Sequence, residues 1–160
     1  MENLTKNIEK IVINVGVGKR SQESNFEDKI LPEIEKNLSI ITGQKPSRQG
    51  AKKSIAGFKI RTGQIVGLKI TLRGLRMKDF LSKIINFALP RVKDFRGLSL
   101  KNVDKNGNLN IGFKEQIVFP EIIPEKTNII FGLQVTIVPK VQKRDSAIDL
   151  YRRLGVPFKK

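Results

Sequence analysis

The side chains that most often perform catalysis in enzymes are absent from this sequence. It contains neither histidine nor cysteine. Thiolate nucleophiles, disulfides, zinc sites with the usual ligands and imidazole acid–base catalysis are therefore excluded. Catalysis would have to rely on carboxylates, lysine or serine, and we find no motif for such a site. The sequence therefore argues against an enzyme, and we expect no metal ion and no cofactor.

One motif faintly resembles a nucleotide-binding loop. Gly16-Val17-Gly18-Lys19 follows an apolar, strand-like segment. A phosphate-binding loop also needs a glycine five residues before its second glycine and a serine or threonine after the lysine, but those positions hold Ile13 and Arg20. A strand that ends in a tight backbone turn explains these glycines better.

A pair of carboxylates, Asp145 and Asp149, has the spacing of residues on one face of a helix. Such a pair could act in acid–base chemistry or hold a metal ion. The surrounding arginines, Arg144, Arg152 and Arg153, instead indicate a charge-balanced helix surface with an aspartate in its first turn.

Positive charge is the strongest global feature of the chain. It carries 31 Lys and Arg against 15 Asp and Glu, which gives a net charge of +16. Between residues 36 and 78 the sequence has no acidic residue at all. Ordinary solvated surfaces mix both signs of charge, so a long acid-free stretch favours a surface that binds a polyanion over a surface that faces only water.

The basic residues of this stretch concentrate around a loop of small residues between Gly50 and Gly57. A mobile, solvated loop is one interpretation. Because the loop also contains Ile55 and Phe58, we favour a loop that becomes ordered on a nucleic acid, with its cations on phosphates. The cations are Lys45, Arg48, Lys52, Lys53, Lys59 and Arg61.

Other partners and functions remain as rivals at this point. No segment approaches the roughly 18 apolar residues of a membrane-spanning helix, and no signal peptide opens the chain, so we expect an intracellular protein without a membrane partner. A DNA-binding or chaperone-like RNA-binding module would have a similar composition. A small enzyme acting on nucleic acid is disfavoured by the lack of His and Cys.

The elements that position these residues follow from hydrophobic periodicity. We predict strands at residues 8–15, 58–61, 65–73, 109–113 and 129–138. We predict helices at 26–41, 77–88 and 146–154. Pro32 should kink the first helix or delay its start to Leu31, and Pro90 should end the second helix. Residues 44–57 are interpreted as an irregular basic loop, and Asn106-Gly107 as a turn.

Several of these strands are apolar on one face and polar on the other. This pattern predicts a single α+β domain, residues 1–160, in which helices cover one face of a mostly antiparallel sheet and a basic loop spans 45–58. The open face would carry Lys10, Asn14, Lys69, Thr71 and Arg73. Asn14, Gln44 and Thr71 are uncharged, and their pattern alone is compatible both with ordinary strand polarity and with RNA contacts.

Several long segments of the sequence resemble those of a known protein family. The segments IEKIVINVGVGK, ITGQKP, AKKSIAGFKIR, GLKITLRG, LPRVKDFRG, GNLNIGFKEQIVFPEI and LGVPFKK run through almost the whole sequence. They are similar to large-subunit ribosomal protein number five, the 5S ribosomal RNA binder, in its bacterial form. Bacterial members usually carry a further helix before the first strand, where this chain has only a few residues.

The resemblance implies a curved antiparallel sheet and a place in the central protuberance of the large subunit. The expected partners are 5S rRNA, 23S rRNA, the tRNA in the P site and small-subunit ribosomal protein thirteen. The expected location is the ribosome, in the cytoplasm or in an organelle.

The resemblance also implies roles for individual residues. Asn14, Gln44 and Thr71 match family positions that hydrogen-bond 5S rRNA. The neighbouring cations complete the expected 5S site, namely Lys10, Lys45, Lys69 and Arg73. The loop expected to face tRNA contains Lys52, Lys53, Ser54 and Ile55. Contacts to other rRNA are expected from Arg91, Lys93 and Arg96.

Overall fold

The computed structural model describes residues 5–159 of the chain. The strands are β1 (Ile8–Gly16), β2 (Ser47–Gly50), β3 (Ile65–Leu72), β4 (Leu109–Phe113) and β5 (Leu133–Pro139). The α-helices are α2 (Leu31–Thr42), α3 (Gly74–Lys83), α4 (Leu89–Arg91) and α5 (Arg144–Arg153). Two π-helical turns, Phe26–Ile30 and Ile84–Ala88, lead into α2 and α4. Short 3-10 turns occupy Arg20–Gln22, Ala56–Phe58, Leu100–Asn102, Gln116–Val118 and Pro124–Lys126.

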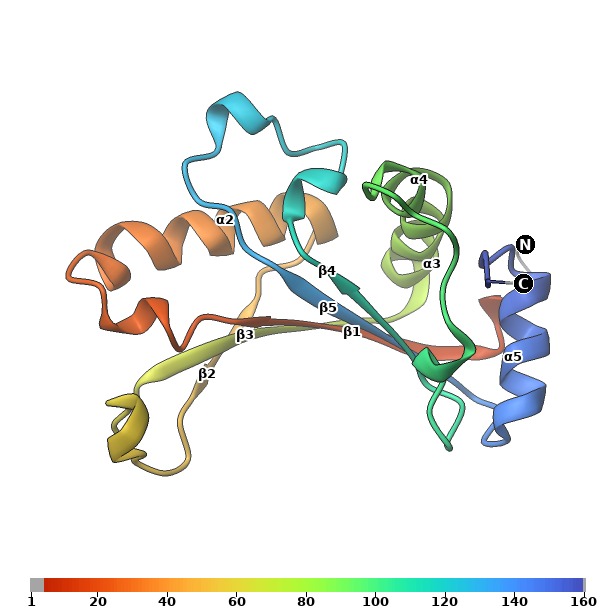
Figure 1. Cartoon of the computed structure of the whole chain (residues 1–160), viewed down its shortest axis with the longest axis horizontal. Coiled ribbons are helices and arrows are strands. Elements are labelled where there is room, and N and C mark those ends of the chain that lie inside the picture. Colours follow the sequence, from red (N-terminus) through yellow and green to blue (C-terminus); the bar gives the residue numbers. More distant parts are fainter. Residues whose placement is uncertain (1–4, 160) are drawn as a thin grey trace.

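The strands form one five-stranded sheet in the order β2-β3-β1-β5-β4. Every pair of neighbouring strands is antiparallel, and the central strand β1 pairs with β3 on one side and β5 on the other. Figure 1 shows α2, α3 and α4 above this sheet, α5 at one end, and no α-helix of the described chain below it. The predicted α+β fold with an open antiparallel sheet is confirmed.

The core lies between the upper face of the sheet and the helices. Alternate residues of the strands are buried there, including Ile11, Ile70 and Val135. Each such side chain contributes about 1.5–3 kcal/mol when it leaves water. The binary pattern therefore decides which face of the sheet the helices cover. The first predicted helix has apolar residues at steps of three to four, and these are buried as well at Phe26, Ile34, Leu38 and Ile41, while Ile30 is half-buried.

Pro32 and Pro90 both lie within helical segments, and each comes just after a π-helical turn changes to an α-helix. Leu31 donates its N–H to the carbonyl of Phe26, and Leu89 donates its N–H to that of Ile84, so each π-helical turn ends two residues before a proline. The start of α2 at Leu31 agrees with the prediction for Pro32. The prediction that Pro90 ends the second helix is wrong, because α4 continues to Arg91. At the first turn of a helix, the missing N–H of proline breaks no helical bond.

The sequence interpretation is also wrong in two places between residues 44 and 61. Residues 47–50, predicted as irregular, form the edge strand β2, which is exposed at every position and so lacks an apolar alternation. Residues 58–61, predicted as a strand, contain the end of a 3-10 turn, and Lys59 has a φ of 52°. This left-handed residue cannot continue a strand. Within residues 5–159, the segment takes part in β pairing only through an isolated bridge between Ile55 and Ile60.

The strand predicted at 129–138 begins later, at Leu133. Before β5, the chain bonds to the buried side chain of Gln116 instead of to a neighbouring strand. Its Nε2 donates to the carbonyl of Ile129 at 2.6 Å, and its Oε1 accepts from the N–H of Phe131 at 2.8 Å. The apolar residues there resemble a strand in sequence because they pack on the core, but a side chain satisfies their backbone groups.

The last helix docks on the turn at Asn106-Gly107. Gly107 has a φ of +85°, and a Cβ there would lie 2.8 Å from that of Ala147 on α5. The Tyr151 hydroxyl donates to the Gly107 carbonyl oxygen at 2.8 Å, and burial raises the pKa of this phenol. The predicted turn is confirmed.

Within residues 5–159, no helix combines the length and apolar character that a bilayer crossing needs.

Candidate nucleic-acid interface

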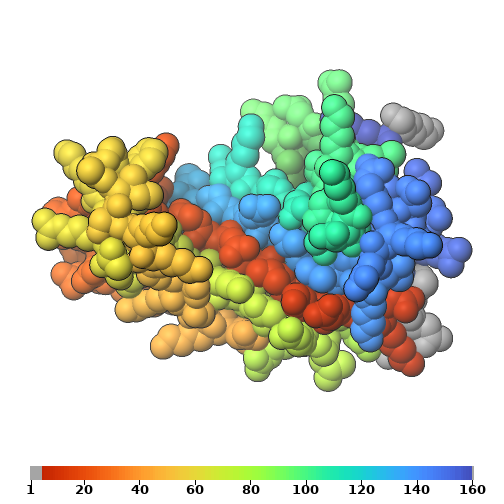
Figure 2. Space-filling model, turned by 90° about the horizontal axis from the view of Figure 1, so that it is seen from below, coloured from red at the N-terminus to blue at the C-terminus, as the bar shows by residue number. Residues whose placement is uncertain are grey.

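The lower face of the sheet is uncovered, and Figure 2 views the molecule from that side. Cross-strand pairs in a sheet point to the same face, so the register shows which side chains meet there. One row runs across four strands, because Asn14 pairs with Lys69 on one side and Gln134 on the other, and Lys69 also pairs with Ser47. All four side chains are exposed. The row presents one cation among uncharged hydrogen-bonding groups.

A second row lies two residues further along the strands. Val12 of β1 pairs with Thr71 of β3 and Thr136 of β5, and Thr136 pairs with Asn110 of β4. The Thr136 hydroxyl donates to the Asn110 side-chain oxygen at 2.7 Å. Gln44, just after α2, donates its Nε2 to the main-chain oxygen of Thr71 at 3.2 Å. This bond ties the helix end to the open face.

The structure therefore places Asn14 and Thr71 in adjacent rows of the open face, and Gln44, the third uncharged residue predicted for 5S rRNA, is hydrogen-bonded to the main chain of Thr71. Within residues 5–159, no hydrogen bond involves the side chain of Asn14, which leaves its donor and acceptor available to a ligand. An amide that offers both groups on a flat surface can contact ribose hydroxyls and base edges.

The predicted cations lie beside this polar patch. The pairing of Ile11 with Leu72 makes Lys10 and Arg73 the next residues along the two strands. Lys10 lies 3.3 Å from the carboxylate of Glu9, and Arg73 is exposed at the start of α3. Lys45 and Lys69 are also exposed, and the ion pairs found in the described part of the chain involve neither. Their charges face the solvent.

One cation of the basic stretch is occupied within the protein. The Arg48 guanidinium donates from Nε and Nη2 to the two carboxylate oxygens of Glu35, at 2.6 and 3.0 Å. The hydrogen bond from Arg48 holds the pKa of Glu35 below its usual value. A bidentate pair of this kind joins β2 to α2. Arg48 is therefore not a free phosphate-binding group, contrary to its place in the predicted basic cluster.

Two glycines leave main chain bare beside this patch. Gly16 pairs with Gly67. Gly16 follows Asn14 by two residues on β1, and Gly67 precedes Lys69 by two residues on β3. A Cβ built on Gly16 would meet no atom within 4 Å, and one on Gly67 would make only ordinary contacts. The fold itself does not require glycine at Gly16. Gly16 ends β1 and Gly67 lies within β3, and a glycine inside a strand is typical of places where a ligand or another backbone approaches closely.

The loop between β2 and β3 forms a hairpin that extends past the sheet, visible at one end in Figures 1 and 2. Its tip holds the residues predicted to face tRNA, Lys52, Lys53, Ser54 and Ile55, and all are exposed. The hairpin has its own hydrogen bonds. The Ser54 hydroxyl accepts from the N–H of Thr62 at 2.9 Å, and Ala51 donates to the Gln64 carbonyl at 2.8 Å.

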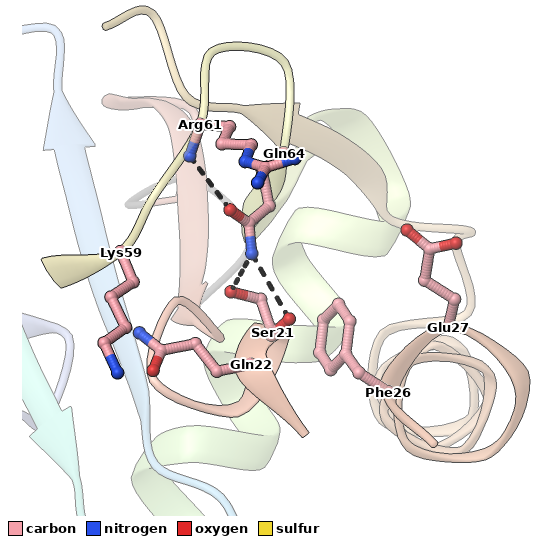
Figure 3. Close-up of a pocket in the computed structure, with 7 residues that line it drawn as sticks. All are labelled: Ser21, Gln22, Phe26, Glu27, Lys59, Arg61 and Gln64. Carbon is pink, nitrogen blue, oxygen red and sulfur yellow. Dashed lines mark hydrogen bonds between the residues drawn. The ribbon is translucent and has the colours of Figure 1, made fainter. Parts of the chain in front are cut away.

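Side-chain hydrogen bonds also anchor this hairpin to the segment after β1. Figure 3 shows Gln64 between the two parts. Its Oε1 accepts from the N–H of Arg61 at 3.0 Å, and its Nε2 donates to the hydroxyl of Ser21 at 2.9 Å. Gln22 donates to the Phe58 carbonyl at 2.6 Å. These bonds lie around a cavity of about 610 Å³, and they hold the hairpin in a defined position.

Comparison with known proteins shows the family of this chain. Residues 5–61 match the family model described as ribosomal protein L5, and residues 65–158 match a second model, described as the C-terminus of the same ribosomal protein family. A large ribosomal subunit protein uL5 from Lacticaseibacillus casei is 49% identical over 153 residues, which is 96% of this chain and 83% of the relative. The uL5 protein of Mycoplasma pneumoniae is 50% identical over the same shares. That of Halothermothrix orenii is 46% identical over 151 residues, 94% of this chain and 82% of the relative.

The chain belongs to the ribosomal protein L5 family. The resemblance inferred from the sequence motifs is thereby confirmed. As an L5-family protein, the chain is a structural constituent of the large ribosomal subunit and acts in translation. RNA binding is typical of this family, which is not one of enzymes, so the predictions of an RNA-binding ribosomal component and of no catalysis hold.

The remaining predicted rRNA contacts of this L5-family chain lie apart from the open face. Arg91 ends α4, and Lys93 and Arg96 follow in the segment after it, which lies on the helix side of the sheet in Figure 1. All three are exposed. The structure thus separates the predicted cations into an open-face group, a hairpin group and a helix-side group.

Sequence analysis missed part of the open face. Gln134 and Thr136 on β5, and Asn110 on β4, lie in the same rows as Asn14 and Thr71. A signal was present on β5, because its polar residues alternate with buried apolar ones. No sequence pattern indicated that these residues lie in the same rows as Asn14 and Thr71, since that depends on the pairing of strands far apart in sequence.

Proposed function

We propose that this L5-family chain docks 5S rRNA on the open face of its sheet, beside 23S rRNA in the central protuberance of the large subunit. One observation carries the proposal: the uncovered face presents the uncharged side chains of Asn14 and Thr71, with Gln44 bonded to the Thr71 main chain, beside cations and in strand rows that contain no acidic side chain. The cations are Lys10, Lys45, Lys69 and Arg73.

The chemistry of this face fits double-stranded RNA. The minor groove of A-form RNA is wide and shallow and displays ribose hydroxyls and base edges, so a flat sheet can approach it. Asn14 and Thr71 would bond to these groups, while Lys69 and Arg73 would neutralise the flanking phosphates. Bare main chain at Gly16 would allow the ribose edge to come close.

The hairpin is proposed to contact the tRNA in the P site through Lys52, Lys53, Ser54 and Ile55. In support, the hairpin extends beyond the sheet, and hydrogen bonds of Gln64 and Gln22 anchor its position. A tip that is already ordered loses less entropy on binding than a free loop would. The hairpin can therefore serve a second RNA while the sheet holds the first.

The helix-side group, Arg91, Lys93 and Arg96, is proposed to contact 23S rRNA. These exposed cations lie on the helix side of the sheet, away from the open face. The protein would then lie between 5S and 23S rRNA, with a basic surface toward each. The bridge to small-subunit ribosomal protein thirteen follows from the family resemblance, and we assign no residues to it.

A gel-shift experiment tests the central proposal. At moderate salt, the purified protein should shift 5S rRNA at concentrations that do not shift an unrelated RNA of the same length. Equal shifts of both RNAs would contradict specific docking.

In a second measurement, the protein should co-sediment with large subunits in high magnesium. A DNA-binding or chaperone-like module acting outside the ribosome would remain in the supernatant.

A further inference from the structure

Phe58 is an exposed aromatic residue at the tip of the hairpin. Its exposed fraction is 67%, against 56% for Phe87 on the helix side. Ile55, whose carbonyl accepts a hydrogen bond from the N–H of Phe58, is 47% exposed. A single exposed apolar residue needs no explanation, but two at the tip of an ordered hairpin create an apolar spot that nothing in the described chain covers.

The backbone around Phe58 is held in place. Lys59 has a φ of 52°, a conformation that few non-glycine residues adopt. Gln22 donates to the Phe58 carbonyl at 2.6 Å, and Gln64 joins the hairpin to Ser21, a link drawn in Figure 3. An unusual backbone conformation that the surroundings maintain is a feature found at binding sites. Phe58 is therefore presented in a fixed position.

The charges near Phe58 indicate which class of molecule its side chain contacts. Four cations belong to the same hairpin, and no acidic residue occurs between residues 36 and 78. An apolar protein surface or a lipid tail would not need this charge, whereas a nucleic acid offers phosphates beside flat, apolar base faces. Aromatic side chains stack on such faces, and neighbouring cations bind the backbone. The four cations are Lys52, Lys53, Lys59 and Arg61.

We propose that Phe58 is a stacking platform for an exposed base face of RNA. The inference rests on the proposed function, because it assumes that the hairpin meets RNA. The base can belong to tRNA in the P site or to 23S rRNA, since both present the same chemistry, whereas 5S rRNA is proposed to lie on the open face. Phe58 supplies the stack, and the four cations hold the phosphates on either side of the base.

Tryptophan fluorescence tests the stack directly. The chain has no tryptophan, so Phe58→Trp creates a protein with a single one. Large subunits are reconstituted with the variant and, separately, with the parent. The emission of the variant subunits minus that of the parent subunits reports this tryptophan alone. This difference should fall when a base stacks on the ring. Quenching when deacylated tRNA is added would assign the base to tRNA, and quenching on assembly before tRNA is added would assign it to rRNA. Either result supports the stack.

The matched control is Phe87→Trp, at an exposed aromatic position on the helix side. Unchanged emission of the Phe58→Trp variant through assembly and tRNA addition would overturn the inference. Equal quenching of the tryptophans at positions 58 and 87 would also overturn it, because it would report only the general proximity of nucleic acid.

Substitutions at Phe58 separate stacking from simple apolar contact. Phe58→Ala and Phe58→Leu should release the RNA identified by the quenching at least about fivefold faster, whereas Phe58→Tyr should retain it. The thermal midpoint of unfolding should not change, since the side chain is exposed. Leucine that performs as well as phenylalanine would contradict stacking.

The same variants distinguish this inference from the proposed function. Gel shifts with 5S rRNA should be identical for the parent and the Phe58 variants. Failure of the parent itself to shift 5S rRNA would contradict the proposed function. A normal 5S shift, combined with no effect of Phe58→Ala on the release of RNA, would contradict only the stacking inference.

Discussion

Asn14 lies at the centre of the open face, with Lys69 and Gln134 as its cross-strand neighbours. Because its side chain makes no hydrogen bond within the described part of the chain, its polarity contributes little to folding. A residue of this kind should matter for binding and not for stability. The opposite holds for Arg48, whose charge is used in the pair with Glu35.

Replacing Asn14 or Thr71 by Ala should therefore weaken 5S rRNA binding by about 1–3 kcal/mol, because a polar RNA group would be left buried without a partner. Gel-shift titration measures the loss, and the thermal unfolding midpoint serves as the control for folding. Parent-like affinity in both variants, with the fold intact, would show that the sheet is not the docking surface.

Gly16 offers a steric probe of the same surface. A Cβ there meets nothing within 4 Å, so Gly16→Val should leave stability unchanged or raise it by up to about 1 kcal/mol, since valine favours strands. The added volume should reduce 5S rRNA affinity. Gly57→Ala is the control, because a Cβ at Gly57 also meets nothing within 4 Å but lies on the hairpin. Unchanged 5S affinity of Gly16→Val would mean that RNA does not approach the main chain here.

At the scale of elements, the hairpin and the sheet should act on different RNAs. Changing Lys52 and Lys53 together to Glu should leave 5S rRNA binding nearly intact, because these residues lie at the hairpin tip, away from the Asn14 rows. The effect should appear as weaker P-site tRNA binding in ribosomes that carry the variant. If the double variant loses 5S rRNA binding at unchanged stability, the hairpin contacts a different RNA from the one proposed.

The segment before β5 depends on a single buried side chain. Gln116→Ala should destabilise the protein, at about 1–3 kcal/mol for each buried backbone group that loses its partner at Ile129 and Phe131. Chemical denaturation measures this change. Gln142→Ala, at an exposed position, is the control and should be neutral. A neutral Gln116→Ala variant would show that water replaces these hydrogen bonds.

At the scale of the whole molecule, the question is whether the net charge of +16 acts generally or through one face. Each cation that neutralises a phosphate releases counterions, so the logarithm of affinity falls against the logarithm of salt by about 0.7 to 0.9 per contact. Changing Lys69 and Arg73 to Gln should flatten this slope for 5S rRNA by about one to two units.

The comparison pair is Arg152 and Arg153, which are exposed on α5 at the end of the sheet. Their replacement by Gln should change the salt slope little, although it removes the same net charge. Equal flattening by both pairs would show that overall charge attracts the RNA, and the open face would then have no special role.

Local patterns were sufficient for much of the fold. Alternation in β1 and β3 predicted which side chains are buried, since side chains in a strand point to opposite faces in turn. The stripe of Ile34, Leu38 and Ile41 predicted the buried side of α2, because residues three to four apart share one side of a helix. Composition predicted a polyanion partner, and the motifs predicted the family.

Sequence reasoning failed where a local pattern is either absent or satisfied by a distant partner. β2 is exposed at every position, so no alternation marks it. The chain before β5 resembles a strand, but its backbone partner is a side chain, Gln116, that lies more than a dozen residues away along the chain. Pro90 was predicted to end its helix because proline lacks an N–H, and the prediction failed because the π-helical turn before it has no sequence signature.

Only the tertiary structure decided which polar residues form the candidate site. Asn14 and Gln134 became neighbours through strand register, which is set by packing of the opposite, apolar face and not by the polar residues themselves. Arg48 was removed from the available cations because α2 places Glu35 beside it. The charge and the residue types were thus properties of the sequence. Their grouping was a property of the packed sheet, because residues distant in the chain meet only after the core has formed.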